Sequence, residues 1–265
     1  MSENRPHPRE FRARLVRGEP LLGTFMKVPA TQNTEVLGML GFDFVVLDEE
    51  HAPWTRATLD QSLLAARAAG TAGIVRIARP DAASVLSVLD DGAIGVMCPH
   101  VDSAEKARNL VSWAKYHGGM RGAGVSRGCD YGALPDMTRT ADSFTTVICM
   151  IEDRQALDVI DDISKVEGVD AMFLGRGDLG LSLSNASDPV PALADAVENV
   201  VHIAKANGKA VSAVVQSMKS DEAKWLIDLG VTAMMVAQDL AFMRQAASAA
   251  LNDFNEVMKG VGQTP

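Results

Sequence analysis

Short apolar runs alternate with amphipathic stretches along almost the whole chain. We expect eight strands, at residues 21–26, 44–47, 73–77, 95–98, 146–151, 168–174, 210–215 and 231–237. Helical patterns follow these runs, the clearest at residues 55–69, 103–116, 190–207 and 240–257. Runs that are apolar throughout are typical of parallel strands that are covered on both faces. Eight strands that each precede a helix predict an α/β fold, a (β/α)8 TIM barrel.

An open, doubly wound sheet is the alternative fold. It usually has fewer strands, and no GxGxxG turn follows the first apolar run. We expect a single barrel domain over residues 1–265, with residues 1–18 as an N-terminal extension. Residues 117–142 are rich in Gly and Arg and too long for a plain loop, so we expect an excursion with short helices there.

Composition narrows the classes of partner. The chain has 265 residues and a formal net charge of −9, which argues against nucleic acid and anionic membranes, since both reward clustered Lys and Arg. No apolar run approaches the roughly 20 residues of a membrane span, and no signal peptide is visible. The three cysteines, Cys98, Cys129 and Cys149, are widely spaced, as is typical of reduced thiols. We therefore expect a cytoplasmic protein.

Ionisable residues gather at the ends of the expected strands. The second apolar run leads into Asp48, Glu49, Glu50 and His51. The third run contains Arg76, the fifth ends at Glu152 and Asp153, and the sixth is followed by Asp178. Each has a structural alternative, because the acids can favour a helix dipole or cap a helix and a single histidine is more often structural. In a barrel, however, the carboxyl ends of parallel strands converge on one site.

The residue types indicate a particular chemistry. Two carboxylates with no cysteine or histidine beside them suit a hard cation such as Mg²⁺ or Mn²⁺. The glycines on either side of Arg176 would let backbone N–H groups approach an anion. A metal, an arginine and a base around an anion pocket can together form an enolate.

Several motifs, in this order and spacing, resemble one known family. They are Leu47-Asp48-x-Glu50-His51-Ala52-Pro53, Val75-Arg76, Leu89-Asp90-x-Gly92-Ala93, Arg121-Gly122, Ile151-Glu152 and Gly175-x-x-Asp178-Leu179. The chain thereby resembles the HpcH/HpaI aldolases, which are metal-dependent class II pyruvate aldolases. The resemblance extends from about Leu22 to the last helix, and its motifs are specific only in combination.

The resemblance implies roles for individual residues. Glu152 and Asp178 would hold a divalent metal, Mg²⁺ or Mn²⁺ with Co²⁺ as a further candidate. His51 would be the acid/base group, with Asp90 raising its basicity, and Arg76 would stabilise the enolate.

Further residues would support this machinery. The backbone at Gly177 and Asp178 would bind the carboxylate of pyruvate, with Gly175 and Arg176 beside them in the substrate site. Asp48 would orient the histidine or a water molecule, although a purely structural role at the strand end is equally open.

Two departures from the family pattern concern substrate choice. Met150 stands where the family often has Gln, and Arg176 stands where it usually has Pro. Arg176 could select an acidic acceptor or point to solvent, and we favour solvent. A third departure, a segment before Arg121 that is one residue shorter, leaves the metal site and base unchanged.

The function implied by the resemblance is reversible cleavage of a 4-hydroxy-2-oxo acid into pyruvate, or a close 2-oxo acid, and an aldehyde. Alternatives are a related metal-enolate lyase, such as an oxaloacetate decarboxylase or an acyl-CoA lyase, and a non-catalytic barrel that binds an oxo acid. The resemblance also implies a homohexamer, a trimer of dimers, with the C-terminal helix swapped between subunits. The apolar face of residues 240–254 would equally suit packing on the chain's own barrel.

Overall fold

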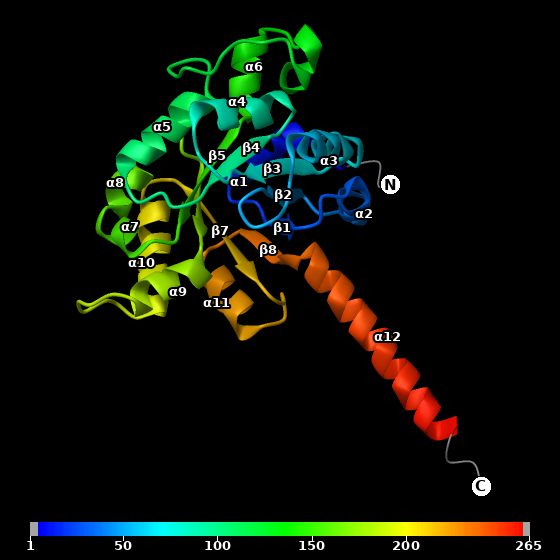
Figure 1. Ribbon diagram of the computed structural model, residues 1–265. Coiled ribbons are helices and arrows are strands. Elements are labelled where there is room, and N and C mark those ends of the chain that lie inside the picture. Colours follow the sequence, from blue (N-terminus) through cyan, green and yellow to red (C-terminus); the bar gives the residue numbers. More distant parts are fainter. Residues whose placement is uncertain (1–4, 262–265) are drawn as a thin grey trace.

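Eight parallel strands close into a barrel in the computed structural model, which describes residues 5–261 (Figure 1). The strands pair in sequence order, and β1 also pairs with β8. They are β1 (Leu21–Met26), β2 (Phe44–Asp48), β3 (Ala72–Arg76), β4 (Gly95–Cys98), β5 (Thr146–Ile151), β6 (Ala171–Leu174), β7 (Ala210–Val215) and β8 (Ala233–Gln238). The expected (β/α)8 barrel is confirmed, and the open sheet is excluded.

Helices surround the strands. In chain order the structure has η1 (Pro8–Glu10), α1 (Phe11–Val16), α2 (Thr31–Leu40), α3 (Arg56–Ala68), α4 (Ala82–Asp90), α5 (Ala104–Ala114), η2 (Arg127–Gly132), α6 (Met137–Phe144), α7 (Arg154–Asp158), α8 (Ile160–Ser164), α9 (Arg176–Ser184), α10 (Leu193–Ala206), α11 (Asp221–Leu229) and α12 (Asp239–Val261). Several begin where the side chain of Thr55, Asp81, Ser103 or Ser220 accepts a backbone N–H bond. These caps satisfy donors that the first helical turn leaves free.

Strand residues alternate between two apolar clusters. The barrel interior holds Phe25, Phe44, Val46, Ile74, Met97, Ile148, Met150, Phe173 and Met235. The layer between strands and helices holds Val45, Leu47, Val75, Val96, Val147, Cys149, Met172 and Ala213. Because side chains alternate with a period of two, Asp48, Arg76 and Glu152 point the same way as the interior residues two positions before them. They therefore form the upper, carboxyl-terminal layer of the barrel.

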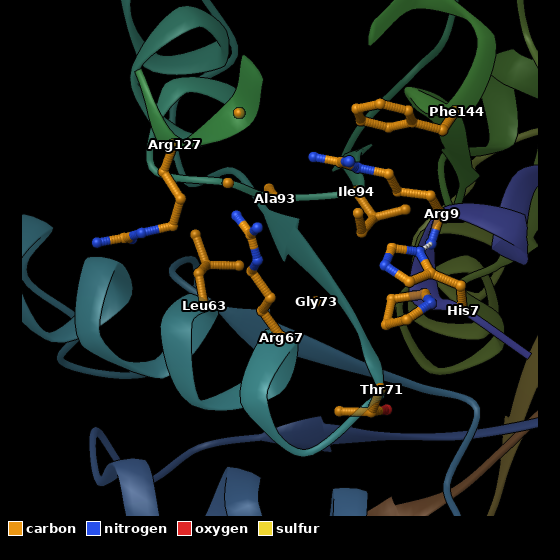
Figure 2. A pocket seen from close by; sticks show the side chains of 13 residues that line it. His7, Arg9, Leu63, Arg67, Thr71, Gly73, Ala93, Ile94, Arg127 and Phe144 are labelled. Carbon is orange, nitrogen blue, oxygen red and sulfur yellow. Dashed lines mark hydrogen bonds between the residues drawn. The ribbon is translucent and has the colours of Figure 1, made fainter. Parts of the chain in front are cut away.

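The N-terminal segment closes the opposite end of the barrel. Phe11 and Leu15 of α1 are buried in the interior cluster, and the ring of Phe11 lies 5.0 Å from that of Phe44. Residues 8–16 of the expected extension therefore contribute to the core. Beside them is a pocket whose lining includes Arg9, Arg67 and Arg127 (Figure 2).

The excursion expected at residues 117–142 contains η2 and most of α6, as predicted. Its position is set by pairs with distant residues: Asp130 binds Arg9 and Arg67, and Arg127 binds Asp60. These contacts hold it against the amino-terminal side of the barrel.

The last helix, α12, projects away from the barrel (Figure 1). Beyond its first turns it leaves large apolar side chains exposed: Met243, Leu251, Phe254, Val257 and Met258. Most of its length does not pack against its own barrel. The sequence left open whether the apolar face of residues 240–254 would pack there, and in this structure it does not. Within residues 5–261, no helix combines the length and apolar composition needed to cross a membrane.

Candidate functional site

The floor of the site is an ion pair between neighbouring strands. Asp48 and Arg76 are register partners at the ends of β2 and β3. Arg76 donates two hydrogen bonds to Asp48, from Nε to Oδ1 at 2.7 Å and from Nη2 to Oδ2 at 2.6 Å. Asp48 has no exposed surface and Arg76 is 5% exposed. Burial raises the pKa of Asp48, but the bonds and charge of Arg76, together with Lys27, outweigh it and lower the pKa.

The ring of Phe25 helps to fix the arginine. The guanidinium carbon of Arg76 lies 4.9 Å from the centre of that ring, a cation–π distance. Nη1 is the remaining terminal nitrogen, and it lies 3.2 Å from Oε2 of Glu50. Since Nε and Nη2 are both held by Asp48, Nη1 is the nitrogen through which Arg76 can meet a substrate.

Three carboxylates lie near one another at the carboxyl-terminal end of the barrel: Glu50 after β2, Glu152 after β5 and Asp178 in α9. Glu152 directly follows β5 and is 2% exposed, while Asp178 lies in the first turn of α9 and is exposed. Burial raises the pKa of Glu152; the N–H and the charge of His100 lower it, and the charges of Glu50 and Asp178 raise it further. Oε2 of Glu50 is buried and, among the residues described, accepts no hydrogen bond. The charge of Glu50 is nevertheless balanced by Arg76, whereas Glu152 has no lysine or arginine partner among the described residues.

Gly175 allows this group to form. A Cβ atom at Gly175 would lie 2.5 Å from Cβ and 2.7 Å from Oε2 of Glu152, so a larger residue could not occupy the position without displacing the carboxylate. The amino end of α9 thereby comes close to Glu152. Its first-turn N–H groups have no carbonyl partner within the helix and favour negative charge.

His51 lies at the entrance rather than on the floor. Its side chain is 56% exposed, and Nε2 is 3.8 Å from Oε2 of Glu50. Its backbone N–H donates to Oδ1 of Asp48 at 3.3 Å. The structure therefore brings His51 together with Asp48, Arg76 and Glu50, as the strand-end argument predicts.

Asp90 lies elsewhere. It ends α4, the helix that returns the chain to the start of β4, and its Oδ1 is 3.3 Å from Nη2 of Arg121. This position is toward the amino-terminal ends of the strands. Within a single chain, the expected contact between Asp90 and His51 is not formed.

Arg176 is not directed to solvent, so the orientation that we favoured is wrong. Its side chain is 13% exposed, and the guanidinium binds Glu222 of α11 and the carbonyl of Val214 at the end of β7. A helix that starts at Arg176 also places Asp178 inside its first turn, not at an N-cap. The N-cap role that we considered for Asp178 is therefore excluded. Around Gly177 a Cβ would meet nothing within 4 Å, which leaves open space beside Asp178.

Two further residues, His100 and Lys27, lie at the carboxyl-terminal end of the barrel and are not among the site residues predicted from the sequence. His100 follows β4 with φ at 54°, and its backbone N–H donates to Oε1 of Glu152 at 2.8 Å. Burial lowers the pKa of His100, but the hydrogen bond with Asp153 and nearby carboxylates outweigh it and raise the pKa. Lys27 follows β1 and binds Asp48. Lys27 stands directly after an expected strand and His100 two residues after one, so the rule that identified Glu152 could have identified them.

The donor set determines which groups the site can bind. Within the described chain, no three His, Cys, Asp or Glu side chains are close enough to form a metal site by themselves. A cation here would therefore also need donors from water or substrate. Carboxylate oxygens with unmet charge suit a hard divalent ion, and Arg76 suits a carboxylate or an enolate.

Comparison with known proteins gives a consistent result. The family model of the HpcH/HpaI aldolase/citrate lyase family matches residues 22–246. A 5-keto-4-deoxy-D-glucarate aldolase of Escherichia fergusonii is 32% identical over 258 residues, which cover 96% of this chain and 99% of the relative. A hydroxypyruvate/pyruvate aldolase of Delftia acidovorans is 33% identical over 249 residues, which cover 92% of this chain and 91% of the relative.

A solved structure is also similar over its full length. It is an HpcH/HpaI aldolase/citrate lyase family protein from Burkholderia cenocepacia J2315, with a TM-score of 0.86 and 27% sequence identity. The match covers 93% of this chain and 99% of that one.

Proposed function

This chain belongs to the HpcH/HpaI aldolase/citrate lyase family, and we propose that it reversibly cleaves a 4-hydroxy-2-oxo acid into pyruvate, or a close 2-oxo acid, and an aldehyde. It is a carbon–carbon lyase, since relatives that are aldolases align with more than 90% of its length. The observation that most strongly supports the proposal is the carboxylate of Glu152, which is buried at the same end of the barrel as the Asp48–Arg76 pair and has no lysine or arginine partner among the described residues.

Glu152 and Asp178 would hold a divalent cation, Mg²⁺ or Mn²⁺ with Co²⁺ as a further candidate. The residues fit this ion, because Glu152 is buried without a lysine or arginine partner in the described chain and has a raised pKa. The bound ion would act as a Lewis acid on the 2-oxo group. The free N–H groups near Gly177 and Asp178 would bind the carboxylate of the 2-oxo acid.

The remaining steps use protein side chains. His51 would accept the proton of the C4 hydroxyl as the bond between C3 and C4 breaks, and would then return a proton to C3. Arg76, through Nη1, would hold the negative charge that develops on the enolate. Asp48 would fix Arg76 in that orientation, because its two oxygens engage Nε and Nη2.

We also propose a homohexamer, a trimer of dimers, in which α12 is exchanged between subunits. Leu251, Phe254 and Val257 are each at least 59% exposed on a helix that its own barrel does not cover. Asp90 can support His51 only if a neighbouring copy brings it there, because α4 places it toward the other end of the same chain. A mass measurement in solution tests the assembly.

The exchange of pyruvate methyl protons for deuterium tests the reaction itself. With Mg²⁺ in D₂O, the protein should exchange these protons, a chelator should abolish the exchange, and His51→Ala should slow it by at least about 100-fold. Asp161→Asn, an exposed substitution on α8, is the matched control and should change nothing. If the unmodified protein exchanges no pyruvate protons with Mg²⁺, with Mn²⁺ or with Co²⁺, pyruvate is refuted as the product.

Metal binding is tested without turnover. Titration with Mn²⁺, followed by electron paramagnetic resonance, should show one bound ion per chain in the unmodified protein and none in Glu152→Gln at the same concentrations. Equal binding by the two proteins would show that Glu152 is not a ligand.

A further inference from the structure

Asp239, the first residue of α12, is 7% exposed and ties the start of that helix to the segment that follows β1. Its Oδ1 accepts the backbone N–H of Lys27 at 2.9 Å. Its Oδ2 accepts the backbone N–H of Val28 and an N–H of the Asn33 side chain, each at 3.1 Å. These hydrogen bonds fix the position of the Lys27 backbone relative to α12.

The end of β8 is shaped to bring Asp239 to this position. Ala237 has φ at 46°, in the left-handed region that a residue with a Cβ atom seldom adopts. The register between β1 and β8 also shifts between Gly23 and Phe25, and Phe25 pairs with Gln238. Backbone strain of this kind persists only where the surrounding contacts maintain it. The hydrogen bonds of Asp239 are such contacts.

The side chain of Lys27 extends these contacts into the candidate site. Its Nζ binds Oδ2 of Asp48, and the two oxygens of Asp48 accept Nη2 and Nε of Arg76 at 2.6 and 2.7 Å. Oδ1 of Asp48 also accepts the backbone N–H of His51 at 3.3 Å. Asp48 therefore holds the arginine and the backbone of the histidine, and Lys27 connects Asp48 to Asp239.

Lys27 also contributes to the balance of charge around Arg76. The two cations face two carboxylates, because Lys27 and Arg76 both bind Asp48, and Nη1 of Arg76 lies 3.2 Å from Oε2 of Glu50. Without the lysine, one guanidinium would face both acids. Less positive charge would then act on an enolate at Nη1, and Asp48 would lose one of the two donors that fix its Oδ2.

We propose that Asp239 and Lys27 are positioning residues, which act in series through Asp48 to hold Arg76 in the orientation that stabilises the enolate. The inference rests on the proposed function, in which Nη1 of Arg76 meets the developing negative charge. It makes the first residue of α12 part of the support of the site. Because both residues act through Asp48, the chemical step should depend on them more than the binding of pyruvate does.

The exchange of pyruvate methyl protons for deuterium measures enolate formation. At saturating Mg²⁺ and pyruvate, Lys27→Met should lower the rate constant of exchange by about 10- to 100-fold. The pyruvate concentration for half-saturation should change by less than about threefold. Lys27→Arg keeps the charge and should recover most of the lost rate. An unchanged rate constant in Lys27→Met, or a change confined to half-saturation, would overturn the inference.

A double-mutant cycle tests whether the two residues act in series. Asp239→Asn replaces one acceptor oxygen by an amide that cannot accept an N–H bond, and it should slow exchange about tenfold. If Asp239 acts through Lys27, the double variant should be within about twofold of Lys27→Met alone. Losses that multiply would show independent roles and overturn the inference.

A milder variant keeps the cycle decisive even where Asp239→Asn does not fold. Asn33→Ala removes a single donor to Asp239 and should slow exchange by about two- to threefold in the unmodified background. In the Lys27→Met background, the same substitution should have no effect. An equal loss in both backgrounds would contradict action in series.

The pair of Lys165 and Asp161 at α8 provides matched controls, because it contains the same two residue types on the exposed surface. Lys165→Met and Asp161→Asn, singly and together, should leave exchange unchanged. Urea unfolding of every variant reports stability separately. If the substitutions at Lys27 and Asp239 lower only the free energy of unfolding and the folded protein exchanges at the original rate, their role is structural and the inference fails.

The outcomes separate this inference from the proposed function. If the unmodified protein exchanges pyruvate protons and the variants exchange at the same rate, only the inference fails. If the unmodified protein exchanges none with Mg²⁺, with Mn²⁺ or with Co²⁺, the proposed function fails, and the inference fails with it.

Discussion

At the amino-terminal end of the barrel, carboxylates are matched by arginines, whereas at the carboxyl-terminal end Glu152 is buried with no lysine or arginine partner among residues 5–261. Asp130 binds both Arg9 and Arg67, each at 2.8 Å, and Figure 2 shows Arg9 beside the ring of Phe144, with 4.7 Å between guanidinium carbon and ring centre. In the part of the chain that the structure describes, the partners of Glu152 are the backbone N–H and the partly exposed ring of His100.

This difference indicates that the charges at the amino-terminal end stabilise the fold, whereas those at the carboxyl-terminal end serve the reaction. Paired charges at the amino-terminal end fasten η1, α1 and η2 to the barrel. Unmet charges at the other end cost folding free energy and can persist because a ligand would satisfy them. In (β/α)8 barrels the carboxyl-terminal end carries the reaction, and the comparison is consistent with that rule.

The largest expected effect is the loss of activity when the negative charge of Glu152 is removed. Glu152→Gln keeps the shape of the side chain but removes the negative charge, so kcat/KM should fall by at least about 1000-fold, or about 4 kcal/mol. Without added metal, the free energy of unfolding should stay equal or rise, because a buried charge is lost. Kinetics and urea unfolding in the presence of a chelator measure the two quantities. A marked loss of stability would contradict the comparison.

The corresponding substitution at the amino-terminal end, Asp170→Asn, should lower stability and leave activity nearly unchanged. Asp170 is 4% exposed, pairs with Arg12 at 2.8 Å and accepts the N–H of Val147 at 2.9 Å. Asp170→Asn breaks a partly buried pair, since the Arg12 side chain is 31% exposed, and should lower the free energy of unfolding by about 2 kcal/mol. Turnover by the folded protein should stay within about twofold. A large loss of kcat with intact stability would show that this end takes part in the reaction.

A pH-dependent effect comes from Lys115, which is buried near the amino-terminal end of β5. Burial lowers its pKa to about 8, and its Nζ donates to the carbonyls of Asp142 and Thr145 at 2.8 and 2.6 Å. Between about pH 8 and the ordinary lysine value near 10.4, the unfolded chain holds a proton that the folded chain has lost. Lys115 should therefore make stability rise with pH in this window, by at most about 3 kcal/mol.

Lys115→Met should lack this rise. Urea unfolding of both proteins at several pH values measures the difference, which cancels the titration of the other lysines and tyrosines. Parallel stability curves for the two proteins would show that the amine is not perturbed. A rise that is present in the unmodified protein and absent in Lys115→Met would show that two backbone carbonyls and the nearby Asp142 and Asp170 do not fully replace the hydration of this buried ammonium group.

The strands, the barrel and the strand-end residues follow from local pattern. Apolar runs of four to seven residues determine where strands form, and parallel pairing then brings their carboxyl ends together. Asp48, Arg76 and Glu152 each stand at the end of such a run and at an inward position. Their convergence could therefore be predicted without coordinates. Lys27 and His100 also follow expected strands, so the same pattern indicates that they lie at this end of the barrel.

Other features depended on contacts between residues far apart in the sequence. Arg176 is turned from solvent by Glu222, 46 positions later, and by the carbonyl of Val214. Asp90 is held by Arg121 toward the end of the barrel away from His51, because α4 runs back along the outside of the strands. Local pattern fixes where a strand or helix forms. The partner of a long charged side chain is decided only when closure of the barrel brings distant segments together, so that choice belongs to the tertiary structure.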